Sequence, residues 1–150
     1  MPGAADVAQA LPGAKFPAVT PSAATTAVEV RVRYSETDRM GVAYHAHYLQ
    51  WAELGRTEHM RRHGVRYRAL EERGHLLAVS EAGLRIVRSA RYDDLLRLRT
   101  TVVRLGPAKI EHEYRLFRQE ELLAVGNVTL AVIDREGKVQ RVPEYFQTEE

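Results

Sequence analysis

The chain has 150 residues, 45% of them hydrophobic, so it is long enough for one well-buried core and too short for two ordinary domains. Twenty-two basic against twenty acidic side chains give a formal charge of +2, and the arginines are spread along the chain, which argues against a dedicated nucleic-acid-binding surface. The absence of cysteine excludes disulfides, thiolate metal sites and a cysteine nucleophile, and it suits a reducing compartment, taken here to be the cytoplasm.

Residues 1–26 contain four of the six prolines and show no regular hydrophobic period. This composition predicts a flexible N-terminal arm, followed by one domain over residues 27–150. The arm has a single basic residue, Lys15, whereas a transit peptide is rich in arginine, so no targeting signal is expected. No run approaches the ~20 apolar residues of a membrane span, and we expect a soluble protein.

A strand followed by one long helix opens the predicted domain. Val28, Val30 and Val32 alternate with charged residues, which predicts a half-buried strand over 27–35. Apolar residues at helical spacing then predict a helix over 46–63. Gly55 lies inside that helix at a cost of about 1 kcal/mol relative to alanine, and we interpret it as a place where the helix touches a sheet closely. A short helical turn is expected before Gly74.

The rest of the chain has the pattern of strands, over 76–88, 95–105, 109–117 and 122–134. Gly83 is a possible β-bulge in the first of them, and "GPA" at 106–108 is typical of a tight hairpin turn. The last segment is nearly continuous apolar sequence, as in a strand covered on both faces. Short links favour antiparallel pairing, and such a sheet can bury one helix only by curling round it. The predicted fold is therefore α+β, with Gly55 against the concave face.

Residues suited to chemistry concentrate between the first strand and the helix. Asp38 is ionised at neutral pH without any tuning, as a base or nucleophile must be. The first amides of the helix have no partner within it and can hold a developing oxyanion, and Gly41 would let the main chain approach a ligand. The alternative interpretation is that Asp38 caps the helix or forms an Asx turn, and that Gly41 serves the turn alone.

Three nearby side chains have both a chemical and a structural interpretation. Tyr34 could contact Asp38 or a substrate, or else pack in the core as a strand-end aromatic. His45 could orient water or substrate, or simply cap the helix. Glu53 could be a second base, although a glutamate at this position more often pairs with a neighbour such as Arg56.

No metal site is expected. His59 and His63 stand four residues apart on the predicted helix, but the residues between them lack the glutamate of a zinc hydrolase, and nearby arginines would repel a cation. His112 lies on the inward face of a predicted strand and is expected to be a satisfied core histidine.

A longer motif runs from the first strand into the helix and comprises Tyr34, Glu36, Thr37, Asp38, Gly41, Val42, Tyr44, His45, Tyr48, Glu53, Arg56 and Glu58. It resembles the 4-hydroxybenzoyl-CoA thioesterase family of hot-dog proteins, and within it the short-chain acyl-CoA thioesterases associated with the bacterial tol–pal system. The resemblance covers roughly residues 28–146. It implies a hot-dog fold, in which an antiparallel sheet of five or six strands wraps round one long central helix, and a homodimer that often assembles into a homotetramer.

What the resemblance implies chemically is hydrolysis of short-chain acyl- or aryl-CoA thioesters, with coenzyme A as part of the substrate and no other cofactor. Asp38 would attack the carbonyl or activate water, and a backbone N–H near Tyr44 would polarise the carbonyl. Tyr34 and His45 match positions implicated at the active site. The residues themselves fit this chemistry, because thioester cleavage requires an anion for attack and a dipole for the oxyanion.

The expected substrate-binding residues lie in two segments, Gly41 with Val42, and Arg88 with Ser89 and Arg91. In the second segment, which also contains Arg85, guanidinium groups could bind the phosphates of coenzyme A. Solvated arginines on strand edges are the alternative.

Two other functions stay open at this point. The first is a hydratase of the same fold. It ranks low, because it would need an Asp-x-x-x-x-His spacing, whereas Asp38 and His45 are seven residues apart. A non-catalytic module that binds acyl-CoA or an acyl carrier would keep the cleft without turning substrate over.

Overall fold

A computed structural model describes residues 25–143, and residues 1–24 of the predicted arm lie outside the described residues. Five antiparallel strands form one sheet in the order β1-β3-β4-β5-β2. Their bounds are β1 Thr25–Arg31, β2 Leu76–Ile86, β3 Leu95–Leu105, β4 Lys109–Arg118 and β5 Glu121–Ile133, and the helices are the single 3-10 turn η1 Tyr34–Glu36, the long α2 His45–Arg62 and the short α3 Tyr67–Glu72. The expected α+β architecture is confirmed.

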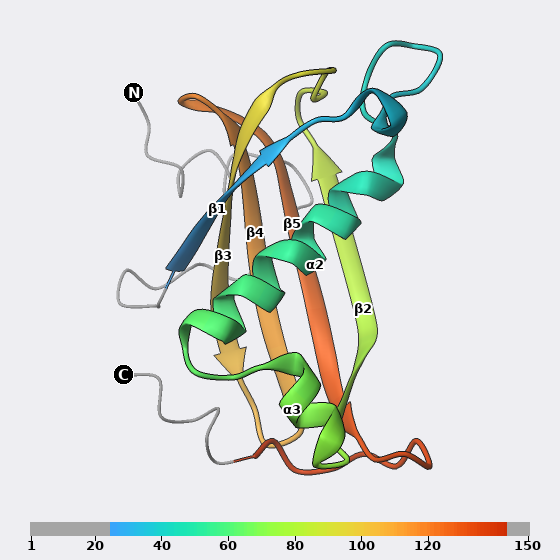
Figure 1. Ribbon diagram of the computed structural model, residues 1–150, viewed down its shortest axis with the longest axis vertical. Coiled ribbons are helices and arrows are strands. Elements are labelled where there is room, and N and C mark those ends of the chain that lie inside the picture. The colour runs from blue at the N-terminus through green and yellow to red at the C-terminus, as the bar shows by residue number, and fades with distance from the viewer. Residues whose placement is uncertain (1–24, 144–150) are drawn as a thin grey trace.

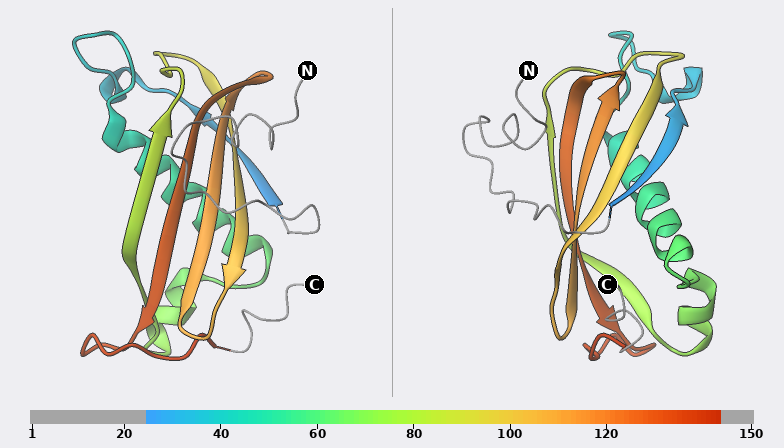
Figure 2. Two further views of the ribbon diagram at one scale, coloured as in Figure 1. Left: turned by 180° about the vertical axis from the view of Figure 1, so that it is seen from behind. Right: turned by 90° about the vertical axis from the view of Figure 1, so that its left-hand side faces the viewer.

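The long helix α2 crosses the concave face of the sheet, as Figures 1 and 2 show. Its packing is mainly against β1 and β3. A side chain at Gly55 would overlap Oγ1 of Thr100 and lie 2.7 Å from Cδ2 of Leu98. The predicted close contact between this glycine and the sheet is therefore confirmed. It sets the position along β3 at which α2 crosses the strand.

The strands show the expected alternation and, in β5, the expected burial on both faces. The hairpin between β3 and β4 closes where Gly106 N–H donates to the Lys109 carbonyl at 2.8 Å. β1 and β2 are the two edges of the sheet. Within residues 25–143, no helix is long and apolar enough to cross a membrane.

Two details of the strand predictions were wrong. The first strand ends at Arg31 rather than 35 and begins at Thr25, because the chain turns at η1, where the Arg33 N–H donates to Glu36 Oε1 at 2.8 Å. The bulge in β2 lies between Val79 and Glu81. Gly83 is in regular register with Asn127, and the amide of that asparagine occupies the space where a Cβ would stand.

Candidate functional site

Asp38 begins a tight loop between η1 and α2. Its N–H donates to the Val42 carbonyl at 2.9 Å, and its carbonyl accepts from the Gly41 N–H at 3.0 Å. Gly41 has φ +77°, and nothing lies within 4 Å of the position that a Cβ would take there. The glycine is therefore explained by the left-handed backbone of the turn. Crowding by the described chain does not require it. Clearance for a ligand at Gly41 stays a prediction.

The Asp38 carboxylate forms an Asx turn, because Oδ1 accepts the Met40 N–H at 2.8 Å. The structural interpretation of Asp38 is thus correct for one of its oxygens. The side chain is partly exposed, and Oδ2 has no hydrogen-bond donor within residues 25–143. One carboxylate oxygen is therefore held in place while the other is open to a ligand.

The start of α2 presents unpaired amides beside this loop. The N-cap residue is Tyr44, and no side chain caps the helix. The Tyr44 N–H itself donates to the Glu36 carbonyl at 2.8 Å, and the His47 N–H donates to the Tyr44 carbonyl at 3.0 Å. The N–H groups of His45 and Ala46 find no acceptor in the described chain, so the open donors lie one and two residues beyond the position expected from sequence.

Glu36 ties the Asp38 loop to the helix, a role that sequence reasoning missed. Its Oε2 accepts the Trp51 indole N–H at 2.9 Å, while its backbone carbonyl accepts the Tyr44 N–H. Glu36 and Trp51 are fifteen residues apart, so no local spacing rule pairs them. The resemblance motif contained Glu36 without indicating this contact.

A second loop, over 87–94, lies against the first. Val42 and Arg91 form an antiparallel bridge, and the Ala43 N–H donates to the Ala90 carbonyl at 2.8 Å. The Ala90 N–H in turn donates to the buried Tyr48 hydroxyl at 2.9 Å. Burial raises the pKa of the Tyr48 phenol above its usual value, so the group stays neutral and can accept this bond.

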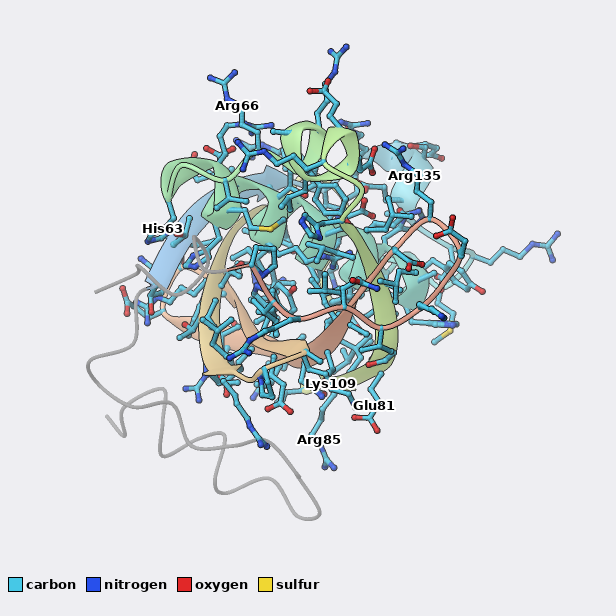
Figure 3. The ribbon with its side chains drawn as sticks, turned by 90° about the horizontal axis from the view of Figure 1, so that it is seen from below. His63, Arg66, Glu81, Arg85, Lys109 and Arg135 are labelled. Carbon is cyan, nitrogen blue, oxygen red and sulfur yellow. The ribbon has the colours of Figure 1, made fainter. Side chains whose placement is uncertain are left out.

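The predicted phosphate-binding residues do not all lie together. Arg88, Ser89 and Arg91 all belong to the 87–94 loop, but the Arg88 Nε lies 3.2 Å from Glu121 Oε1 and so is paired with a carboxylate. Asp94 anchors the loop, because its Oδ2 accepts the Arg91 N–H and an Arg118 N–H, each at 2.8 Å. Arg85 lies on β2 and points away from the helices, as Figure 3 shows from below, so it is separated from the loop residues.

Tyr34 and His45 do not take the structural roles that the sequence offered for them, packing in the core and capping the helix. Tyr34 is 78% exposed, so packing in the core was wrong; its ring meets Tyr92 edge-on with centroids 5.5 Å apart. His45 is exposed and makes no cap, and its ring centroid lies 4.3 Å from that of Tyr44.

Glu53 and Arg56 form no ion pair within residues 25–143, which contradicts that expectation. Instead, Glu58 binds Arg61 and Arg62 one turn further along α2. His112 is buried as expected, but its Nδ1 has no partner in the part of the chain that is described, so the expectation of a satisfied histidine was wrong. No group of three or more His, Asp or Glu side chains in the described range is arranged to hold a metal ion.

A narrow pocket of about 20 Å³ opens between the first turns of α2 and the sheet. Its walls are apolar, with small residues at several positions, and comprise Tyr48, Leu49, Ala52, Leu84, Leu98, Tyr114, Leu116, Ala124 and Gly126. Tyr48 belongs both to this pocket and to the contact with the 87–94 loop. The pocket therefore lies beside the first turns of α2 and next to the residue that contacts the 87–94 loop.

Known proteins are similar to this chain in sequence and in fold. The family model described as "Thioesterase-like superfamily" matches residues 32–149. The chain is 37% identical to the acyl-CoA thioesterase YbgC of Haemophilus influenzae over 114 residues, which are 75% of this chain and 83% of that protein. Among solved structures, a probable thioesterase from Bartonella henselae is 33% identical with a TM-score of 0.76, covering 80% of this chain and all of that one. A DHNA-CoA thioesterase from Staphylococcus aureus is 28% identical with a TM-score of 0.78, covering 82% and 84%.

Proposed function

This chain belongs to the thioesterase-like superfamily and has its hot-dog fold, and from that premise we propose that it is an acyl-CoA thioesterase that hydrolyses short-chain acyl-CoA to the free acid and coenzyme A. The observation that supports this most is the placement of Asp38: backbone bonds hold its loop against the uncapped start of α2. A relative at 37% identity is named an acyl-CoA thioesterase.

In the proposed reaction, the thioester carbonyl lies between Asp38 and the first turn of α2. Asp38 Oδ2 either removes a proton from water as it attacks the carbonyl carbon or attacks the carbon itself, forming an anhydride that water then cleaves. The N–H groups of His45 and Ala46, at the positive end of the helix dipole, stabilise the oxyanion. When the tetrahedral intermediate collapses, the C–S bond breaks and the thiolate of coenzyme A leaves and takes up a proton.

The proposed acyl site is the narrow pocket below the helix start. Its size supports a short aliphatic group over an aryl ring, because a ring would need neighbouring side chains to move. The similarity to YbgC supports placing the chain in the tol–pal-associated branch of the 4-hydroxybenzoyl-CoA thioesterase family. Tyr34 and His45, exposed beside the loop, would contact the pantetheine arm or position water.

For the coenzyme, we propose that Gly41, Val42, Ser89 and Arg91 line the entrance, since the Val42–Arg91 bridge brings the two loops together. Arg88 would bind a phosphate only by exchanging its exposed pairing with Glu121, and such exposed pairs are weak. No cofactor is required beyond the coenzyme A of the substrate. The lack of cysteine supports a cytoplasmic location.

We also propose a homodimer that can assemble into a homotetramer. β2 is an eleven-residue edge strand whose outer side has no partner within residues 25–143. Such an edge is a template for pairing with a second chain.

The decisive experiment compares wild type with Asp38→Asn in a free-thiol assay of acyl-CoA hydrolysis, using acetyl-, butyryl-, hexanoyl- and benzoyl-CoA. We expect Asp38→Asn to lose at least a hundredfold in kcat/KM, and benzoyl-CoA to be the poorest substrate. Asp93→Asn, an exposed acid on the neighbouring loop, is the matched control and should keep wild-type rates.

A loss below tenfold, about 1.4 kcal/mol of transition-state stabilisation, would reduce Asp38 to a positioning group. Tight binding of acyl-CoA by wild type without any release of thiol would instead favour the non-catalytic binding module.

A further inference from the structure

The pocket-facing side of α2 continues beyond the pocket to a buried arginine. Leu49 and Ala52 line the pocket, and Arg56 follows four residues after Ala52, so the three residues share one face of the helix. Side chains on a helix lean toward its N-terminus, which inclines the guanidinium of Arg56 toward the pocket. Arg56 is only 7% exposed.

This buried cation lacks an anionic partner. No carboxylate of residues 25–143 forms an ion pair with Arg56, and its Nε has no hydrogen-bond acceptor. Glu53, one turn earlier on α2, is exposed and lines the groove toward β1; its charge reaches Tyr114, but it forms no ion pair with Arg56. A buried charge without a partner is strongly unfavourable, so the arrangement is one that a bound anion would stabilise.

Tyr114 joins Arg56 to the pocket. It lies on β4, is 3% exposed and lines the pocket, and apart from the adjacent Arg56 its hydroxyl has no hydrogen-bond partner in the described range. Burial raises the pKa of Tyr114 to about 12, and the nearby charge of Arg56 opposes that rise. The phenol is therefore a neutral donor at physiological pH. It lines the pocket, and the guanidinium of Arg56 lies close to it.

We propose that Arg56 and Tyr114 form a subsite for a terminal carboxylate on the acyl group, so that the preferred substrates are short dicarboxylic acyl-CoA thioesters. One carboxylate oxygen accepts the Tyr114 O–H and the other meets the guanidinium of Arg56, and both bonds are charge-assisted. The small side chains of Ala52 and Ala124, with Gly126, leave a path for an unbranched chain. This inference rests on the proposed thioesterase function, which it narrows to one substrate class.

The first test needs only the wild-type protein. Thiol release is measured for pairs matched in length, succinyl- with butyryl-CoA and adipyl- with hexanoyl-CoA. We expect kcat/KM to be at least tenfold higher for the dicarboxylic member of at least one pair. Equal or reversed rates within both pairs would overturn the subsite and leave the thioesterase proposal intact, whereas no thiol release from any substrate would overturn the thioesterase proposal.

Binding of the free acids tests the subsite even without turnover. Titration calorimetry with adipate and hexanoate should detect adipate binding at least tenfold tighter, and Arg56→Met should abolish that difference. Equal binding of the two acids by wild type would contradict the proposal.

Variants then assign the residues. The quantity compared is kcat/KM for a dicarboxylic thioester divided by kcat/KM for its length-matched monocarboxylic partner. Tyr114→Phe keeps the buried ring and should lower this ratio by about tenfold or more. Arg56→Lys, which keeps the cation, should retain more of the ratio than Arg56→Met. Arg68→Met, at a 91% exposed side chain on α3, is the matched control and should leave the ratio unchanged. A ratio that survives both Arg56→Met and Tyr114→Phe would refute the assignment.

Discussion

Single buried side chains hold the two loops of the candidate site in place. Tyr48 accepts the Ala90 N–H, and Ala90 accepts the Ala43 N–H just before the helix start. Glu36, just before the Asp38 loop, accepts a hydrogen bond from the Trp51 indole. These residues touch no reacting atom in the proposed mechanism; they position the backbone that does.

Tyr48→Phe should lower kcat more than it changes KM. The Ala90 amide would lose its buried acceptor, at a cost of about 1–3 kcal/mol of stability, and a shift of ~1 Å in the loop can cost about a hundredfold in rate. Steady-state kinetics on butyryl-CoA and urea unfolding measure the two effects. Tyr67→Phe removes a hydroxyl that donates to the Leu77 carbonyl, far from the loops; it should lose stability but keep wild-type kinetics, and an equal loss of kcat in both variants would contradict the positioning role.

His112 should make folding sensitive to acid. Burial, with the nearby His59 and Arg56, lowers its pKa from 6.5 to about 3 in the folded state. The unfolded chain therefore binds the proton more readily, so stability is full above pH 6.5 and falls as the pH drops from 6.5 toward 3, by about 2 kcal/mol at pH 5. Urea unfolding between pH 8 and pH 5 measures this loss.

His112→Leu should flatten that pH dependence, because the buried leucine cannot be protonated. His47→Gln, at a histidine that hydrogen-bonds Gln50 and meets the Tyr44 ring near the surface, should preserve it. A wild-type unfolding free energy equal at pH 7 and pH 5 would show that His112 does not control acid stability.

At the scale of elements, the contact between α2 and β3 sets the position of the helix start over the sheet. Gly55 is the point of closest approach, and the pocket lies along the same helix toward its N-terminus. A change in this contact therefore moves the proposed oxyanion donors relative to the Asp38 loop. The helix has no side-chain cap to stabilise its first turn, so packing of this kind must hold it in place.

Gly55→Ala should destabilise the fold despite the higher helix propensity of alanine. The gain of about 1 kcal/mol in propensity is outweighed by overpacking against buried Thr100 and Leu98, which typically costs about 1–3 kcal/mol. Urea unfolding of the single variant and of Gly55→Ala/Thr100→Ala measures the effect. The double variant should recover part of the loss, since it removes one of the two clashing groups; strictly additive losses would contradict the proposed clash.

At the scale of the whole molecule, the two edges of the sheet are not equivalent. β1 lies beside α2, and Arg62 at the end of that helix donates to the Ala27 carbonyl of β1. β2 has a run of exposed residues over 79–82 along the opposite edge. Figure 1 shows these edges on opposite sides of the molecule. A substitution on one edge can therefore test whether the proposed dimer forms through that edge.

Ala82→Asp should convert the dimer to a monomer. It would place like charges at or near the symmetry axis if β2 pairs with its copy, and like charges directly opposite on paired strands are destabilising. Light scattering after size exclusion should give the mass of two or four chains for wild type and of one chain for this variant. Ala27→Asp, the same change on the exposed part of β1, is the matched control, and an undisturbed assembly in Ala82→Asp would exclude pairing through β2.

The sequence by itself determined the order of strands and helix, the close contact at Gly55 and the segment around Asp38, because period-2 and helical spacing, glycine in a helix and an acid before a helix all express local physics. It misplaced the bulge in β2, the ion pair expected of Glu53 and the environment of Tyr34. Those features depend on contacts between residues distant in the chain. Only the tertiary structure decided that Glu36 binds Trp51, that the 87–94 loop lies against the loop that begins at Asp38, and that Arg56 is buried beside Tyr114 without an anion. No sequence period records which side chains meet across a curled sheet.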